Sequence, residues 1–120
     1  MPKVLVIDDE EPIRELFKIK LENSGYTVEL AVDGCDGLEK FRNNPSDLII
    51  TDIIMPEKEG VETIVELRRE FPDAKIIAIS GGGRIDAETY LLMAKNLGAV
   101  KAFMKPINWT ELLSAVDNLF

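Results

Sequence analysis

Short apolar runs alternate with helical patterns along the whole chain, and this alternation is the feature that most limits its fold. The apolar runs cover residues 3–7, 27–31, 47–51, 75–79 and 101–104. After each run, apolar residues recur every three or four positions, which is typical of an amphipathic helix. Five strands in strict alternation with five helices predict an α/β fold, in which helices cover both faces of a parallel sheet.

The second apolar run indicates the order of the strands. In this run Thr27 and Glu29 alternate with Val28 and Leu30. A strand with one polar face belongs at the edge of a sheet. Placing it beside the first strand favours the order 2-1-3-4-5 of a flavodoxin-like (βα)5 three-layer sandwich. In such sheets ligands bind outside the carboxyl ends of the strands, at the switch point between strands one and three.

Local signals place the expected helices at 12–24, 35–42, 61–71, 85–97 and 109–119. Pro12 is typical of a first turn, Gly25 and Gly98 of helix ends, and Asn108 with Glu111 of a capping box. The residues that share one face at helical spacing are Ile13, Leu16, Phe17 and Leu21; Val61, Ile64, Val65, Arg68 and Phe71; Ala87, Leu91, Ala94 and Leu97; and Trp109, Leu112, Leu113, Val116 and Leu119. Tyr90, Leu92 and Met93 fall outside these faces, so we expect them to be partly exposed.

Composition excludes several kinds of site and partner. Cys35 is the only cysteine and the chain has no histidine, which rules out an internal disulfide, thiolate zinc sites, imidazole metal sites and Ser–His or Cys–His catalysis. Fourteen basic against 22 acidic side chains give a net charge of −8, so we expect no direct binding of nucleic acid. No apolar run approaches the roughly 18–20 residues of a membrane span, and the start has no signal-peptide pattern. We therefore expect a cytoplasmic protein without membrane insertion.

Polar side chains stand where the expected inner strands end. Asp8 and Asp9 follow the first strand, Asp52 the third, Ser80 the fourth and Lys105 the fifth. Clustered carboxylates repel one another, and a hard cation such as Mg²⁺ relieves this repulsion. With a lysine ammonium and a serine hydroxyl at the same edge, the set suits a phosphoryl group beside a metal ion. Taken singly, these residues also fit helix capping, a turn serine and a solvated lysine.

The same residues, with several others in order along the chain, resemble a known family. The segments that carry the resemblance are Val4–Glu10, Asp52, Met55–Pro56, Gly60, Ser80, Gly98–Ala99 and Lys105–Pro106. Together they look like the receiver domain of two-component response regulators, in the CheY-like superfamily. The resemblance covers essentially the whole chain, so residues 1–120 are expected to form a single receiver domain, whether it stands alone or belongs to a longer protein.

The resemblance implies a role for each site residue. Asp52 would be the phosphoacceptor, with Ser80 hydrogen-bonded to the phosphoryl oxygens and Lys105 paired with them. Asp9 and Asp52 would bind Mg²⁺ directly, together with the backbone carbonyl of Ile54, and Asp8 would assist through water; Mn²⁺ can take the place of Mg²⁺. The Lys105–Pro106 peptide bond would be cis, as in this family.

The resemblance also implies the partners. Since the chain has no histidine, a phosphohistidine donor has to belong to another protein. The resemblance implies that this protein is a sensor histidine kinase or a histidine phosphotransfer protein. The fourth helix, fifth strand and fifth helix would form the face for a downstream protein target or for a homodimer. Such a domain is a signalling switch and not an enzyme, apart from its part in its own phosphorylation and dephosphorylation.

Three positions depart from the family pattern or add to it. Ala102 stands where many receivers have a switching Tyr or Phe, and Phe103 beside it must point to the opposite face of the strand. Glycines at 81–83 favour either a loop that closes on the phosphoryl group or a plain surface turn. Ile54 lies two residues beyond Asp52, a position that in this family lines the route of the hydrolytic water. Its side chain can neither orient nor activate water, so we expect a long-lived acyl phosphate.

Two other functions remain open from the sequence. A degenerate receiver that serves only as a binding module is compatible with Ala102, although the complete set of site residues argues against it. A Mg²⁺-dependent phosphohydrolase with an aspartyl-phosphate intermediate would want a second carboxylate two residues after Asp52, and the chain has Ile54 there.

Overall fold

The computed structural model describes residues 2–53, 60–80 and 87–120. Within these ranges the elements are β1 (Lys3–Ile7), α1 (Glu11–Asn23), β2 (Thr27–Ala31), α2 (Gly34–Asn43), β3 (Leu48–Asp52), α3 (Gly60–Glu70), β4 (Ile76–Ser80), α4 (Ala87–Asn96), β5 (Lys101–Met104) and α5 (Trp109–Asn118). Strands and helices alternate as the sequence predicts. None of the described helices has the length and apolar character needed to cross a membrane.

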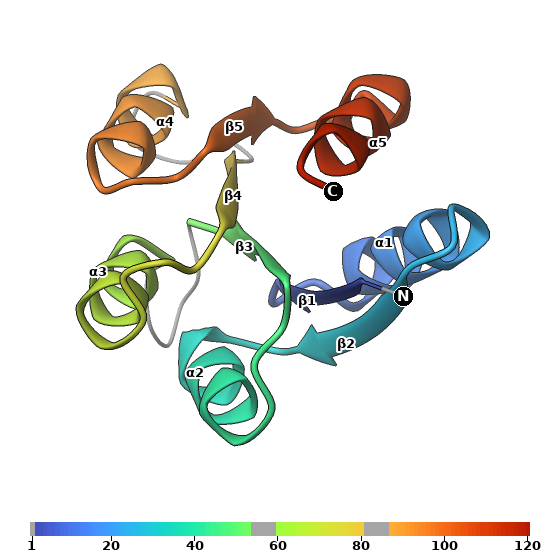
Figure 1. The fold of residues 1–120 in the computed structure, drawn as a ribbon. Coiled ribbons are helices and arrows are strands. Elements are labelled where there is room, and N and C mark those ends of the chain that lie inside the picture. The colour runs from blue at the N-terminus through green and yellow to red at the C-terminus, as the bar shows by residue number, and fades with distance from the viewer. Residues whose placement is uncertain (1, 54–59, 81–86) are drawn as a thin grey trace.

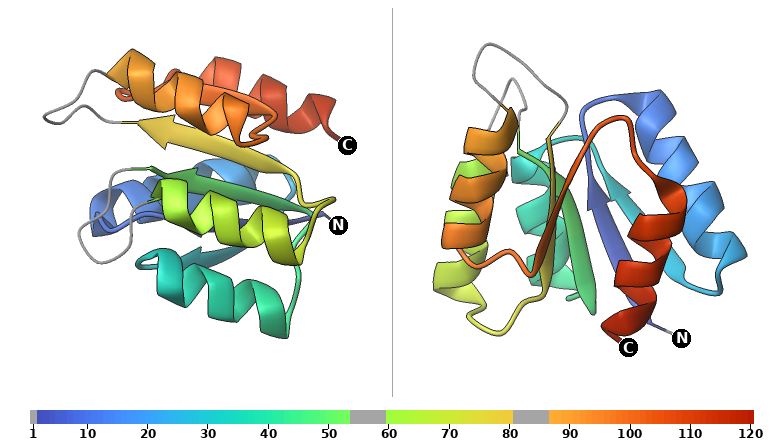
Figure 2. Two further views of the ribbon diagram at one scale, coloured as in Figure 1. Left: turned by 90° about the vertical axis from the view of Figure 1, so that its left-hand side faces the viewer. Right: turned by 90° about the horizontal axis from the view of Figure 1, so that it is seen from above.

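The strands form one parallel sheet in the order β2-β1-β3-β4-β5 (Figure 1). The predicted α/β class and strand order are therefore confirmed. Helices α1 and α5 cover one face of the sheet, and α2, α3 and α4 cover the other (Figure 2). The result is the expected three-layer sandwich, and the polar strand β2 lies at its edge.

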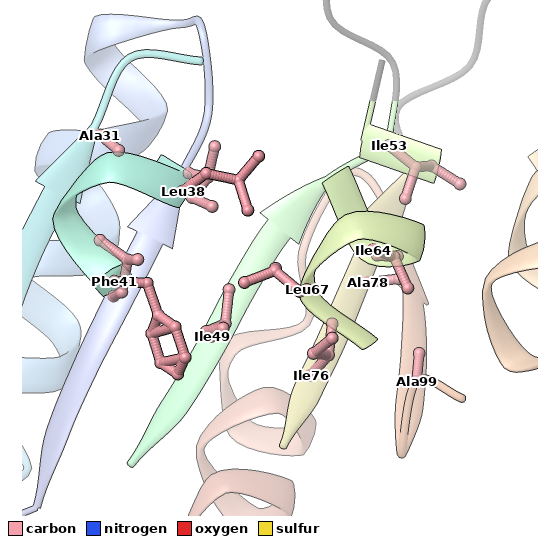
Figure 3. Packing of buried hydrophobic residues seen from close by; sticks show 12 residues of the cluster. Ala31, Leu38, Phe41, Ile49, Ile53, Ile64, Leu67, Ile76, Ala78 and Ala99 are labelled. Atoms are coloured by element: carbon pink, nitrogen blue, oxygen red, sulfur yellow. The ribbon is translucent and has the colours of Figure 1, made fainter. Parts of the chain in front are cut away.

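Successive residues of each inner strand point to opposite faces, and this builds two separate cores. On the side of α2 and α3, Ile49 and Ile76 pack with Leu38, Ile64 and others (Figure 3). On the side of α1 and α5 the core consists mainly of Val4, Val6, Leu48, Ile50, Ile77 and Ile79 from the strands with Phe17, Leu21, Leu112 and Val116 from the helices. Every residue of β3 and β4 is buried, which explains why Leu48–Ile50 and Ile76–Ile79 are all apolar.

The predicted helix signals are confirmed where the structure describes them. Gly25 and Gly98 adopt φ angles of 95° and 105°, the left-handed region that favours glycine at a helix end. The side chain of Asn108 accepts a hydrogen bond from the backbone N–H of Glu111 at 3.1 Å. Trp109 packs edge-to-face on Phe17, with ring centroids 4.8 Å apart, so it serves the core as expected.

Several sequence expectations need correction. Strands β3 and β4 lie one residue later than predicted, so that Asp52 and Ser80 are the last residues of their strands rather than the residues that follow them. The reason is their pairing, since Asp52 lies in register with Ile79. Leu16 and Val65 share faces with buried residues in the sequence pattern, yet both are exposed. The part of each helix that contacts the sheet is narrower than the apolar face that the sequence predicts.

The fourth helix agrees with the pattern in part. Leu92 and Met93 are exposed as predicted, and Leu97 packs against the core on the α2–α3 side. Residues 85 and 86 and the side chains of Tyr90, Leu91 and Ala94 lie outside what the structure describes. On β5, Ala102 packs toward one core and Phe103 toward the other, so the prediction that they point to opposite faces is confirmed.

Helix α2 lies unusually close to β1 at Gly37, and this contact gives a prediction about packing. A Cβ atom at Gly37 would lie 2.3 Å from Cδ1 and 2.7 Å from Cγ1 of the buried Ile7. We expect Gly37→Ala to lower the free energy of unfolding by about 1 kcal/mol, because overpacking outweighs the gain in helix propensity. Urea denaturation provides the measurement.

The control for Gly37→Ala is the double variant Gly37→Ala/Ile7→Val. Valine lacks the Cδ1 atom that the new methyl group would meet. The two substitutions should therefore cost less together than the sum of their separate costs. Strictly additive costs would mean that the contact between α2 and β1 is not the source of the effect.

Candidate functional site at the carboxyl ends of the strands

Four carboxylates gather at the carboxyl ends of β1 and β3. Asp8, Asp9 and Glu10 follow β1, Asp52 ends β3, and each offers an oxygen atom within 4.8 Å of the others. The predicted convergence of Asp8, Asp9 and Asp52 is confirmed. Glu10 joins them, although the sequence analysis gave it no role. It could have been found as the next acid in the run that follows β1.

The carboxylates differ in burial, and this sets their electrostatics. Asp8 and Asp52 are buried, whereas Asp9 and Glu10 are exposed. The pKa of Asp8 is raised to about 6: burial is the main cause and the charge of Asp52 adds to it, whereas the Glu10 N–H and Lys105 lower the pKa. Keeping Asp8 and Asp52 buried side by side in their charged forms therefore costs free energy.

Lys105 supplies the positive charge at this edge of the sheet. Its Nζ atom lies 2.9 Å from Asp52 Oδ2, 3.1 Å from Glu10 Oε1 and 3.2 Å from Asp8 Oδ2. Burial by itself would lower the pKa of Lys105, but the hydrogen bond and charge of Asp52 and the charge of Asp8 outweigh it and raise that pKa. The ammonium therefore stays charged. The Lys105–Pro106 peptide bond is cis, as predicted.

Ser80 contributes a hydroxyl group to the same edge. It is fully buried at the end of β4, and its Oγ atom has no hydrogen-bond partner among the residues that the structure describes. The backbone N–H of Lys105 donates to the Ser80 carbonyl at 2.8 Å, which places the two residues side by side. A buried hydroxyl without a partner costs free energy, and an oxygen-rich ligand would remove that cost.

Two local hydrogen bonds hold the turn between β1 and α1. The backbone N–H of Glu10 donates to Asp8 Oδ1 at 2.8 Å, and Arg14 Nη1 donates to the Asp8 carbonyl at 2.7 Å. Arg14 was not identified from the sequence, since nothing in its surroundings distinguishes it from a solvated residue of α1. Its contact keeps the acidic turn at the carboxyl end of the sheet.

Comparisons with known proteins agree with this geometry. The profile of the family described as "Response regulator receiver domain" matches residues 4–117. The chain belongs to this family. Receiver domains are the signalling modules of two-component systems, and this receiver domain has the acidic cluster and the lysine that a phospho-aspartate site requires.

Solved structures of other receivers are closely similar. A receiver domain protein from Clostridium thermocellum has 31% identity and a TM-score of 0.91, over 99% of this chain and 94% of that chain. The response regulator TrrA from Thermotoga maritima, solved with Mg²⁺ and BeF, has 36% identity and a TM-score of 0.87 over 100% of both chains. NtrX from Brucella abortus has 25% identity and a TM-score of 0.88, and the match covers 98% of this chain but 27% of NtrX.

The donor atoms of this receiver domain suit Mg²⁺ or Mn²⁺. Both are hard cations that prefer carboxylate oxygens, and the cluster offers four carboxylates from two neighbouring strand ends. The charge of Asp52 adds to the effect of burial in raising the pKa of Asp8, and a bound cation would oppose the repulsion between these two carboxylates. Ile54, the residue expected to add a backbone carbonyl, lies outside the described residues, as do the glycines at 81–83.

Proposed function

We propose that this receiver domain is a phosphorylation switch in which Asp52 is the phosphoacceptor. The observation that carries the proposal is the contact between Asp52 Oδ2 and Lys105 Nζ at 2.9 Å, inside a cluster of carboxylates at the switch point of the sheet. The hydroxyl of Ser80, which has no hydrogen-bond partner among the described residues, supports it. A buried nucleophile, a cation and a hydrogen-bond donor are the groups that phosphoryl transfer needs.

The transfer follows from the chemistry of these groups. A carboxylate oxygen of Asp52 attacks the phosphorus of a phosphohistidine, the P–N bond breaks, and its electron pair returns to the imidazole nitrogen. Lys105 balances the negative charge on the phosphoryl oxygens, and Ser80 donates a hydrogen bond to one of them. Since the chain has no histidine, the phosphohistidine belongs to a sensor histidine kinase or a phosphotransfer protein, which we expect in the cytoplasm.

Asp9 and Asp52 would hold the metal ion, with Asp8 in support. Mg²⁺ at this position would supply positive charge to the phosphoryl oxygens. Asp9 is exposed and Asp52 is buried, so one of the two carboxylates lies at the surface of the site and the other lies inside it.

Phosphorylation would alter a face formed by α4, β5 and α5, where a downstream protein or a second copy of the chain would bind. A groove of about 570 Å³ runs over this face between Lys95, Lys101, Phe103 and Glu111. Leu92, Met93 and Met104 are exposed on the same elements, and exposed apolar side chains often mark interaction sites. Because Ala102 carries no ring that could swing inward, the signal would reach this face through the end of β4 and α4.

The test of the proposal is intact mass spectrometry after incubation with acetyl phosphate and Mg²⁺. We expect the wild type to gain the mass of one phosphoryl group and Asp52→Ala to gain none. Asp73→Ala, which removes an exposed aspartate outside the site, is the matched control and should behave as the wild type does. Chelation of Mg²⁺ beforehand should abolish the gain.

A small donor is not accepted by every receiver, so a second measurement completes the test. Binding of beryllofluoride, followed by fluorine NMR in the presence of Mg²⁺, reports the same site without a donor. If the wild type neither gains a phosphoryl group nor binds beryllofluoride, the switch proposal is wrong and a binding module without phosphorylation becomes the better description.

A further inference from the structure

The ammonium group of Lys105 is surrounded by carboxylates: it donates hydrogen bonds to Asp52 and Glu10 and forms an ion pair with Asp8. A lysine ammonium carries three N–H donors and no acceptor. Lys105 Nζ lies within 3.2 Å of carboxylate oxygens from three residues, Asp8, Asp52 and Glu10. A phosphoryl oxygen that approaches Lys105 therefore competes with these carboxylates for the ammonium group.

The three carboxylates differ in how easily they can leave. The side chains of Asp8 and Asp52 are only 2% and 4% exposed, whereas that of Glu10 is 59% exposed. Asp8 is also held by the hydrogen bond from the Glu10 N–H to its Oδ1 atom. A released Glu10 would enter water, whereas Asp8 and Asp52 are buried and their carboxylates have little access to water, so moving either of them away from Lys105 costs more.

The backbone of Glu10 can stay in place when its side chain moves. Glu10 is the N-cap residue of α1, and its carbonyl accepts hydrogen bonds from Ile13 and Arg14. Its side chain makes no capping hydrogen bond to the helix. Glutamate is not among the residues that N-cap positions prefer, and here its carboxylate reaches across to Lys105 instead.

We propose that Glu10 is a positioning residue that occupies Lys105 in the unphosphorylated protein and must release it when the phosphoryl group arrives. The exposed carboxylate thus competes with the phosphoryl oxygens for one donor of the ammonium. The inference rests on the proposed function, because it assigns Lys105 to the phosphoryl group. Its effect is to weaken binding of a phosphoryl group or of a phosphoryl analogue.

The test compares beryllofluoride affinity among variants at saturating Mg²⁺. An exposed ion pair contributes up to about 1 kcal/mol, so Glu10→Gln should bind beryllofluoride roughly two- to fivefold more tightly than the wild type. Glu11→Gln removes the same charge from the adjacent, exposed position on α1 and should bind as the wild type does. Thermal unfolding of each variant verifies that it is folded.

A third variant separates direct contact from general repulsion. Glu10→Asp keeps the negative charge but shortens the side chain by one methylene group, so that it no longer reaches Lys105. If Glu10 acts by occupying Lys105, Glu10→Asp should also bind beryllofluoride more tightly than the wild type. Tighter binding by Glu10→Gln alone would show simple repulsion and would overturn the inference.

The outcomes also separate this inference from the proposed function. A wild type that binds beryllofluoride, with Glu10→Gln binding equally or less tightly, overturns the role of Glu10 and leaves the switch intact. A wild type that does not bind beryllofluoride and does not accept a phosphoryl group overturns both.

Discussion

Replacing Lys105 with methionine is expected to lower the free energy of unfolding by about 3 kcal/mol when no divalent cation is present. The substitution keeps the length of the side chain but removes the charge that lies 2.9 Å from Asp52 and 3.2 Å from Asp8. These two buried carboxylates would then lose the ammonium group that balances their charge. The measurement is urea denaturation at pH 7 with a chelator present.

The control for this variant is Lys101→Met, which removes an exposed lysine from the same strand. It should change the free energy of unfolding by no more than about 0.5 kcal/mol, as is usual for a surface substitution. Millimolar Mg²⁺ should restore more stability to Lys105→Met than it adds to the wild type, because the ion binds the folded cluster and replaces the lost charge. Equal losses in the two lysine variants would contradict the central role of Lys105.

Replacing Asp8 with asparagine is expected to have the opposite effect and to raise the free energy of unfolding at pH 7 by on the order of 2 kcal/mol. Asp8 is almost fully buried, and its pKa is raised from 3.8 to about 6 in the fold. Asparagine has no charge to bury, and it keeps an oxygen atom that can accept the Glu10 N–H.

The pH dependence follows from the direction of the Asp8 shift. Between pH 4 and 6 the folded protein holds a proton on Asp8 that the unfolded chain has already released. Stability due to this group therefore falls as the pH rises through that window and stays low above it. The advantage of Asp8→Asn should accordingly be absent near pH 4 and complete above pH 6.

Two further measurements complete the Asp8 prediction. The variant should bind Mg²⁺ at least tenfold more weakly, since groups that support metal ligands typically contribute that much to affinity. Asp73→Asn, a change at an exposed aspartate, should show neither effect. A loss of stability in Asp8→Asn at pH 7 would mean that its hydrogen bonds and its contact with Lys105 outweigh the cost of burying its charge.

The results expected for the two variants indicate that the excess of negative charge at this site lowers the free energy of unfolding. Removing the negative charge of Asp8 is expected to stabilise the domain, and removing the positive charge of Lys105 is expected to destabilise it. The same excess of negative charge is what attracts a divalent cation. Stability and function therefore oppose each other at the carboxyl ends of β1 and β3.

The order of the elements, the order of the strands and the main site residues could all be predicted from the sequence. These follow from local rules, because the period of apolar residues reports which face is buried, and the polar alternation of Thr27 and Glu29 marks an edge strand. Asp8, Asp52 and Lys105 could be placed at one edge because parallel strands bring their carboxyl ends together. The receiver family could be recognised from the same residues.

The contacts between these elements could not be predicted from the sequence and follow from the folded structure. The contact between Glu10 and Lys105, 95 positions apart, depends on the reach of two long side chains across the end of the sheet. The close approach of Gly37 to Ile7 depends on how near α2 lies to β1, and the exposure of Leu16 depends on how narrow a stripe α1 buries. Periodicity reports which way a residue faces along its own element, whereas distances between elements are set by the packing of side chains from both.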